Sequence, residues 1–82
     1  DFVVEWKTVK VPSGSKLFKA HNFTFMSKGH SWHLEVDEFS DGTFSGHGEH
    51  STDRNSFVES VSGKSLSDCL TALIERVQSR NP

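Results

Sequence analysis

Two histidines and two glutamates alternate within residues 31–49 at a spacing that could bind a metal ion or take up protons. His33 and Glu35 lie two residues apart, and so do His47 and Glu49. On a β-strand, side chains two residues apart point to the same face. Imidazole and carboxylate groups bind Zn²⁺, and a carboxylate next to a histidine raises its pKa. The sequence therefore predicts a candidate zinc- or pH-responsive site at these four residues.

The turn between the two pairs decides whether they meet. A three-residue loop, Ser40–Gly42, places glycine where a type I turn followed by a bulge needs a positive φ. This register sets Leu34 opposite Gly48 on the apolar face of the hairpin. It also sets His33 opposite Glu49 on the polar face. A two-residue loop would instead pair Leu34 with Glu49, so we favour the three-residue loop.

Short stretches of alternating apolar and polar residues predict strands over about 2–11, 18–27, 30–39 and 43–50, with a weaker fifth strand over 57–62. Antiparallel pairing in chain order gathers their apolar residues on one face of the sheet. That face comprises Val4, Trp6, Phe23, Phe25, Trp32, Leu34, Val36 and Phe44. The sequence thus predicts a four- to five-stranded antiparallel β-meander.

Two further turns define this arrangement. A turn at Lys28-Gly29 would set Phe25 opposite Trp32. A loop over 12–17 would bring the first strand back so that Trp6 faces Phe23.

One C-terminal helix is expected to cover the apolar face. Residues 65–79 place five apolar residues at helical spacing, namely Leu66, Leu70, Leu73, Ile74 and Val77. Ser65 is a suitable N-cap, and glycines at 46 and 48 would let the helix approach the sheet closely. The predicted fold class is α+β, as one domain over 1–82, with the sheet over about 2–62 and the helix over about 65–79.

Composition narrows the classes of function. The chain has 82 residues, a net charge of −2 and a single cysteine. This length favours one small domain without a cofactor-binding lobe, and no motif assembles a catalytic set, so we expect no enzyme activity. The lone Cys69 excludes an internal disulfide and slightly favours a reducing compartment such as the cytoplasm. No apolar run is long enough to cross a membrane.

The leading hypothesis is a non-catalytic module that binds a protein partner, or a second copy of itself, through the outer sheet face or an edge strand. The candidate contact residues are those predicted on the outer side of the first strand, with the end of the third: Val3, Glu5, Lys7, Val9 and Phe39. Apart from Zn²⁺, no cofactor is expected.

A second alternative is nucleic-acid binding through N-terminal lysines, namely Lys7, Lys10, Lys16 and Lys19. Residues 31–60, however, carry seven acidic residues and one basic residue. An acidic surface repels phosphates, so we rank this alternative below the other two.

Overall fold

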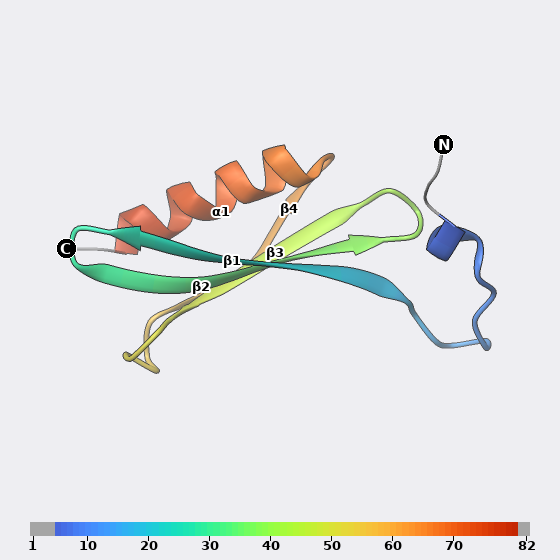
Figure 1. The fold of residues 1–82 in the computed structure, drawn as a ribbon, viewed down its shortest axis with the longest axis horizontal. Helices are drawn as coiled ribbons and strands as arrows, with labels where there is room; N and C mark the ends of the chain where they lie inside the picture. Colours follow the sequence, from blue (N-terminus) through green and yellow to red (C-terminus); the bar gives the residue numbers. More distant parts are fainter. Residues whose placement is uncertain (1–4, 81–82) are drawn as a thin grey trace.

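The computed structural model describes residues 5–80. The chain forms a 3₁₀ turn, η1 (Glu5–Thr8), four strands and a helix. The strands are β1 (Phe18–Ser27), β2 (His30–Phe39), β3 (Phe44–His50) and β4 (Phe57–Gly63), and the helix is α1 (Leu66–Arg80). The sheet is antiparallel with order β1-β2-β3-β4, and α1 lies across one face (Figure 1). This arrangement confirms the predicted α+β class and the C-terminal helix.

Both predicted tight turns form and fix the register. Lys28 and Gly29 have φ of 52° and 82°, which is the left-handed backbone of a two-residue type I′ turn. In the second hairpin the Phe39 N–H donates to the Thr43 carbonyl at 2.9 Å, which closes the three-residue loop. Gly42 takes φ of 92° at the position that needs it.

The predicted cross-strand pairs follow from these turns. Leu34 faces Phe23 on one side and Gly48 on the other. His33 faces Glu49, and the polar side of the hairpin lies on the face away from α1.

The core lies between α1 and the three strands β2, β3 and β4. Its buried side chains are Trp32, Leu34, Val36, Val58, Val61, Cys69, Leu73 and Val77. A Cβ added at Gly46 would lie 3.1 Å from the Cys69 sulfur and 3.2 Å from a Leu73 methyl, so this glycine lets the helix approach. Ser65 Oγ accepts from the Asp68 N–H at 3.0 Å, which confirms the predicted N-cap.

The weaker fifth strand predicted over 57–62 forms β4, and it is irregular. Val61 pairs with Gly46 and Val58 pairs with Gly48, so two residues of β4 lie opposite His47 alone. This β-bulge includes Ser60, whose φ is 34°. Because of the bulge, two valines three residues apart both face α1.

The strand predicted over 2–11 is wrong for residues 5–11, and residues 1–4 lie outside the described part of the chain. Residues 5–8 form η1, where Thr8 Oγ1 donates to the Glu5 carbonyl at 2.8 Å. Lys7 Nζ lies 2.9 Å from Glu38 Oε2, and this ion pair holds the segment at one end of β2. Trp6 therefore does not face Phe23, which pairs with Leu34 and with no other residue of the described chain.

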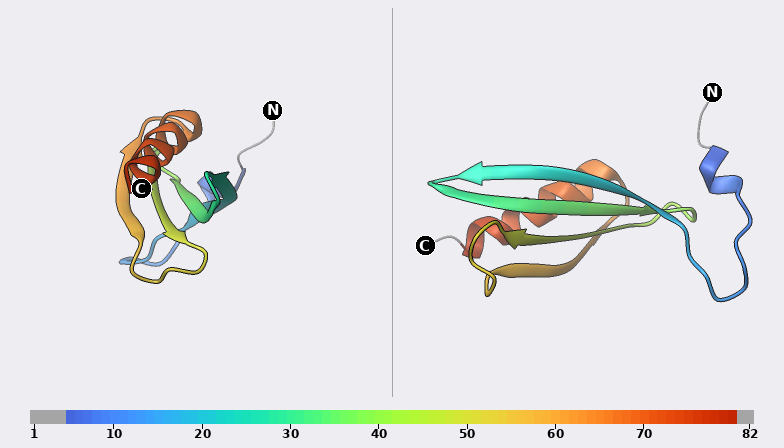
Figure 2. Two further views of the ribbon diagram at one scale, coloured as in Figure 1. Left: turned by 90° about the vertical axis from the view of Figure 1, so that its left-hand side faces the viewer. Right: turned by 60° about the horizontal axis from the view of Figure 1, so that its bottom comes forward.

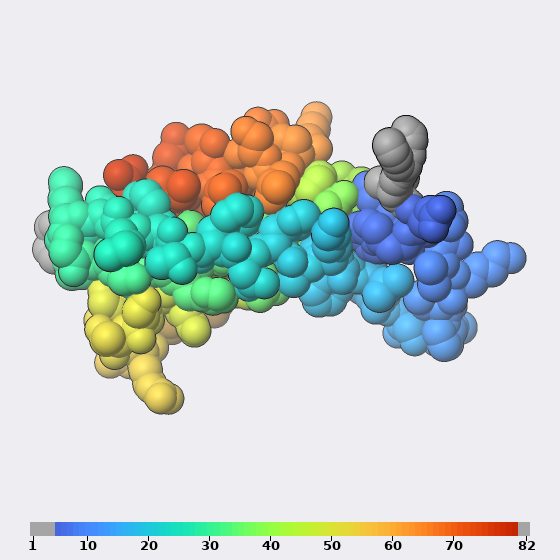
Figure 3. Space-filling view, viewed as in Figure 1, coloured from blue at the N-terminus to red at the C-terminus, as the bar shows by residue number. Residues whose placement is uncertain are grey.

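The molecule is long and thin, with extents of 44 × 27 × 16 Å. Figure 2 shows α1 on one side of the sheet and no described element layered over the other side. Figure 3 shows β1 exposed along its length in front of the helix. Among the described residues, no helix is long and apolar enough to cross a membrane.

Candidate functional site

β1 is the longer of the two edge strands in the described sheet, with ten residues against seven in β4. All ten residues of β1 pair with β2, and no described strand lies on its other side. The two-residue turn makes Ser27 and His30 a hydrogen-bonded pair, and bonded pairs then alternate along the ladder. The N–H and C=O groups of the even-numbered residues therefore point away from β2. These residues are Phe18, Ala20, Asn22, Thr24 and Met26.

The hairpin between β2 and β3 supports the same alternation independently. Its hydrogen bond from Phe39 N–H to the Thr43 carbonyl directs the Phe39 backbone toward β3. Phe39 is the sheet partner of Phe18, so Phe18 makes no ladder bond there and its backbone groups face outward.

The side chains of β1 alternate in exposure. Its odd-numbered residues from His21 onward are half-buried on the helix side, and its even-numbered residues are exposed on the outer side. Phe23 and Phe25 pack against the margin of the core, while Met26 is 74% exposed at the end of the strand. The helix packs on β2, β3 and β4, so β1 extends past the covered part of the sheet.

Residues 20–27, which make up most of β1, carry none of the features that usually protect a free edge. Residues 20–27 contain no lysine, arginine, aspartate, glutamate or proline, and the pairing with β2 has no bulge. Proteins that leave an edge strand exposed usually place charges, proline or a bulge on it to prevent strand addition. An edge without these features is competent to pair with another strand.

A separate polar cluster lies on the outer face of β2 and β3. One oxygen each from Glu35 and Asp37 and one nitrogen of His47 lie within 4.8 Å of one another. Glu35 Oε1 lies 3.9 Å from His47 Nε2. Three such groups at this separation could bind a divalent metal ion or share a proton.

Asp37 is the unusual member of this cluster. Its Oδ1 is buried and accepts no hydrogen bond from any described residue. Burial, together with hydrogen bonding and repulsion from Glu35, raises the pKa of Asp37 from 3.8 to about 6, and burial is the largest of these causes. Two carboxylates can share a hydrogen bond only when one of them is protonated, so the pair favours holding a proton.

The metal set predicted from the sequence is only partly brought together. Glu35 and His47 face each other as expected, and His33 faces Glu49. Asp37, rather than His33 or Glu49, completes the group of ligand atoms found among the described residues. The spacing of two residues between Glu35 and Asp37 on one strand could have suggested this.

Two further histidines, whose contact sequence reasoning missed, lie side by side where β2 begins and β3 ends. His30 Nδ1 lies 3.0 Å from His50 Nε2. His50 Nδ1 accepts from the N–H groups of Thr52 and Asp53 at 3.2 and 3.0 Å. The neutral His50 ring therefore donates from Nε2 to His30. His50 caps the loop after β3, so both of its nitrogens are occupied in a structural role.

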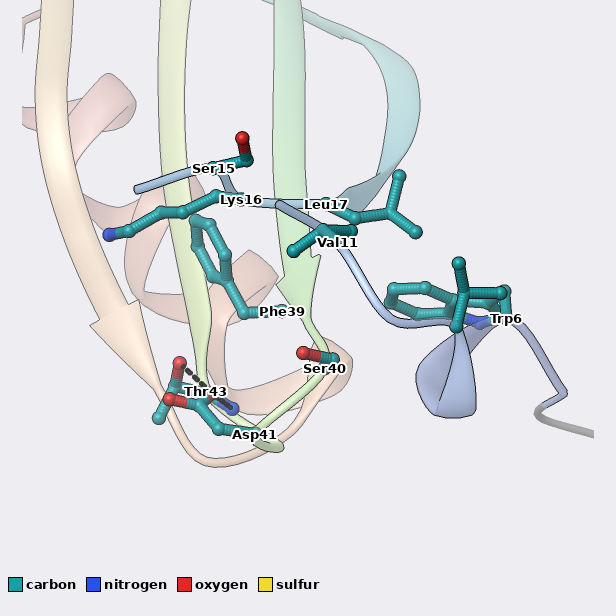
Figure 4. Close-up of a pocket in the computed structure, with 10 residues that line it drawn as sticks. Trp6, Val11, Ser15, Lys16, Leu17, Phe39, Ser40, Asp41 and Thr43 are labelled. Carbon is teal, nitrogen blue, oxygen red and sulfur yellow. Dashed lines mark hydrogen bonds between the residues drawn. The ribbon is translucent and has the colours of Figure 1, made fainter. Parts of the chain in front are cut away.

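The predicted partner-binding residues do not share one strand. Val9 and Phe39 both line a cavity of about 260 Å³ with Trp6, Val11 and Leu17 (Figure 4). Phe39 lies at its centre in Figure 4, with the Lys16 ammonium 5.6 Å from the ring centroid.

The other three predicted contact residues lie elsewhere. Glu5 and Lys7 belong to η1, and Val3 lies outside the described residues. Lys7 is held by Glu38, so two of the four lysines considered for nucleic-acid binding, Lys7 and Lys16, already have partners in the fold.

Comparison with family models, with curated proteins and with solved structures finds no match. The functional argument therefore depends on the geometry of the β1 edge and of the outer-face cluster.

Proposed function

We propose that this domain is a small non-catalytic interaction module that binds a protein partner by adding a strand to β1. The observation that carries the proposal is the unprotected β1 edge. It combines outward-facing backbone groups with a segment, residues 20–27, that has no lysine, arginine, acidic residue, proline or bulge. Main-chain hydrogen bonds to an added strand would satisfy these groups and supply affinity.

The side chains of β1 define which strand would fit. On the helix side, Phe23 and Phe25 are half-buried and would gain cover from apolar residues of the partner. On the outer side, Asn22 and Thr24 are exposed and neutral, so they favour small or polar neighbours. The expected partner segment is therefore extended, apolar at alternate positions and low in charge.

The proposal is tested by removing one outward N–H group. The Thr24→Pro variant loses the N–H that faces the free edge, while the bonds from β1 to β2 remain. Peptides selected from a random displayed library on the wild-type domain should bind the Thr24→Val variant equally well, because it keeps the N–H. They should lose most of their binding to Thr24→Pro.

The binding site is mapped by amide NMR shifts. Shifts along β1 that disappear in Thr24→Pro would support strand addition. A library that yields no peptide at this edge, or peptides that bind both variants equally, would contradict it.

The outer-face cluster supports a second candidate function, a metal- or pH-responsive site at Glu35, Asp37 and His47. The specific observation is the buried Asp37 oxygen without a donor, next to a second carboxylate. A Zn²⁺ titration followed by amide NMR should give saturable shifts near these residues. His47→Ala should abolish them, and His33→Ala should leave them unchanged. Shifts that depend equally on both histidines, or no shifts at all, would count against this cluster.

A further inference from the structure

We infer that the strand added to β1 is β1 of a second copy of this chain, antiparallel across a two-fold axis centred on Phe23. This inference rests on the proposed strand addition and names its partner. It follows from the direction of the backbone groups, the length of the strand, and the side chains that each register would bring together.

The outward backbone groups restrict the register. Only even-numbered residues of β1 direct N–H and C=O groups to the free edge, so hydrogen-bonded pairs must join even residues of the two copies. Such a register also pairs odd residues with odd residues. The apolar, helix-side residues of one copy then meet those of the other, and the sheet stays continuous.

The length of β1 leaves two registers that use the strand almost fully. One is centred on Asn22 and pairs residues 18–26 with themselves. The other is centred on Phe23 and pairs residues 19–27 with themselves. Every other symmetric register that satisfies the backbone pairs fewer residues.

The side chains favour the register centred on Phe23. It places Phe23 beside Phe23 of the second copy in a non-hydrogen-bonded pair, where side chains approach most closely. Phe25 lies opposite His21 of the second copy and diagonally across from its Phe23, so four half-buried phenylalanines gather on the helix side. In the register centred on Asn22, Lys19 would instead lie opposite Phe25.

Charge is compatible with self-association across this edge. Lys19 is the only lysine, arginine, aspartate or glutamate of β1, and it would lie opposite Ser27 of the second copy. No like charges therefore face each other within the paired segment. On the outer face, Asn22 lies opposite Thr24, and Ala20 lies opposite Met26.

The resulting dimer would be a continuous antiparallel sheet with both helices on the same face. Its bare outer face would carry both outer-face clusters, one from each copy. Half-buried apolar residues of β1 would become part of a joined core between the two helices.

A pair of double variants tests both the partner and the register by sedimentation equilibrium. Asn22 and Thr24 are exposed, so substitutions there leave the core intact. Asn22→Lys with Thr24→Lys places like charges opposite each other and should weaken dimerisation by roughly tenfold or more. Asn22→Glu with Thr24→Lys places opposite charges together twice and should keep the wild-type association. Both variants should show the wild-type amide spectrum away from β1.

Each outcome has a distinct meaning. A wild-type chain that stays monomeric up to about 1 mM would overturn the second copy as partner. If library peptides still bind β1, strand addition itself would stand, and if they do not, both proposals fail. A dimer unaffected by the two lysines would use another surface and would also overturn the inference. Loss of the dimer in the Glu–Lys variant would overturn the register, because centring on Asn22 would oppose two glutamates.

Discussion

The two edges of this sheet are built differently. On β4, the bulge at Ser60 disturbs the ladder and Glu59 adds a charge. The Arg80 guanidinium also donates to the Phe57 carbonyl at 2.8 Å, so the end of α1 is tied to this strand. On β1, residues 20–27 are regular, contain no lysine, arginine, aspartate or glutamate, and lie beyond the main contacts of the helix. One sheet therefore protects one edge and leaves the other free.

Because the two edges differ, the strands that stabilise the fold are not the strand proposed to bind a partner. The helix buries β2, β3 and β4, and their side chains form the fully buried core. β1 contributes no fully buried side chain to that core, although its ten residues pair with β2. A strand that contributes little to the core but keeps a long open edge is well placed for association.

The largest expected effect compares the covered and uncovered parts of the sheet. Leu73 is fully buried in α1, and Leu73→Ala should lower the free energy of unfolding by about 3 kcal/mol. Phe25 on β1 is half-buried, and Phe25→Ala should cost about 1 kcal/mol. Urea unfolding of both variants at low protein concentration measures this difference. Equal costs would mean that β1 belongs to the core as fully as α1 does.

A smaller effect on stability should come from Asp37, on the outer face and away from both edges, and it should depend on pH. The pKa of Asp37 is about 6 in the fold against 3.8 ordinarily, so the native state holds a proton that the unfolded state has lost. Stability from this group therefore falls as pH rises from about 4 to about 6, and the whole penalty is present above that range.

The Asp37→Asn variant removes this titration. It should stabilise the fold by about 1 kcal/mol at neutral pH, since partial exposure reduces the full linkage value. At pH 4 the two proteins should have similar stability. Glu35, His47 and His21 are the titratable groups that act on Asp37, and all three remain in the variant. A stability gain that is the same at both pH values would contradict this assignment.

The hairpin registers could be predicted because local and long-range signals agree. Gly42 identifies the loop length, and only one register then keeps Leu34 opposite a small apolar-face residue. For residues 5–11, before β1, no turn residue tests the pairing in this way. Its short alternation resembled a strand, but the ion pair from Lys7 to Glu38 positions it, and that contact joins residues far apart in sequence.

The candidate sites were predicted less completely for the same reason. Alternation placed Glu35 and His47 on one face, but the burial of Asp37 depends on the packed sheet. The sequence does not predict a free β1 edge, because the strand predicted over 2–11 would lie beside β1. The bulge in β4 left one sequence signal, two buried valines three residues apart, which is the wrong spacing for a regular strand.

The smallest change in stability is expected for a variant that removes the bulge of β4, the feature that protects this edge. Deleting Ser60 would place Val58 and Val61 two residues apart, so both would still face α1 along a regular strand. The positive φ at Ser60 would also disappear, and the free energy of unfolding should stay within about 1 kcal/mol of the wild type.

The effect of this deletion should lie in assembly instead. With a regular β4, both edges of the sheet would accept a strand, and pairing at two edges has no closed end. Light scattering should then detect species larger than a dimer that grow with concentration. The matched control is Ser60→Gly, which relieves the positive φ but keeps the bulge, and it should associate like the wild type. If the deletion variant stays folded and associates no further than this control, the bulge does not protect the β4 edge, and the contrast between the two edges would have to rest on charge and on the contact with Arg80.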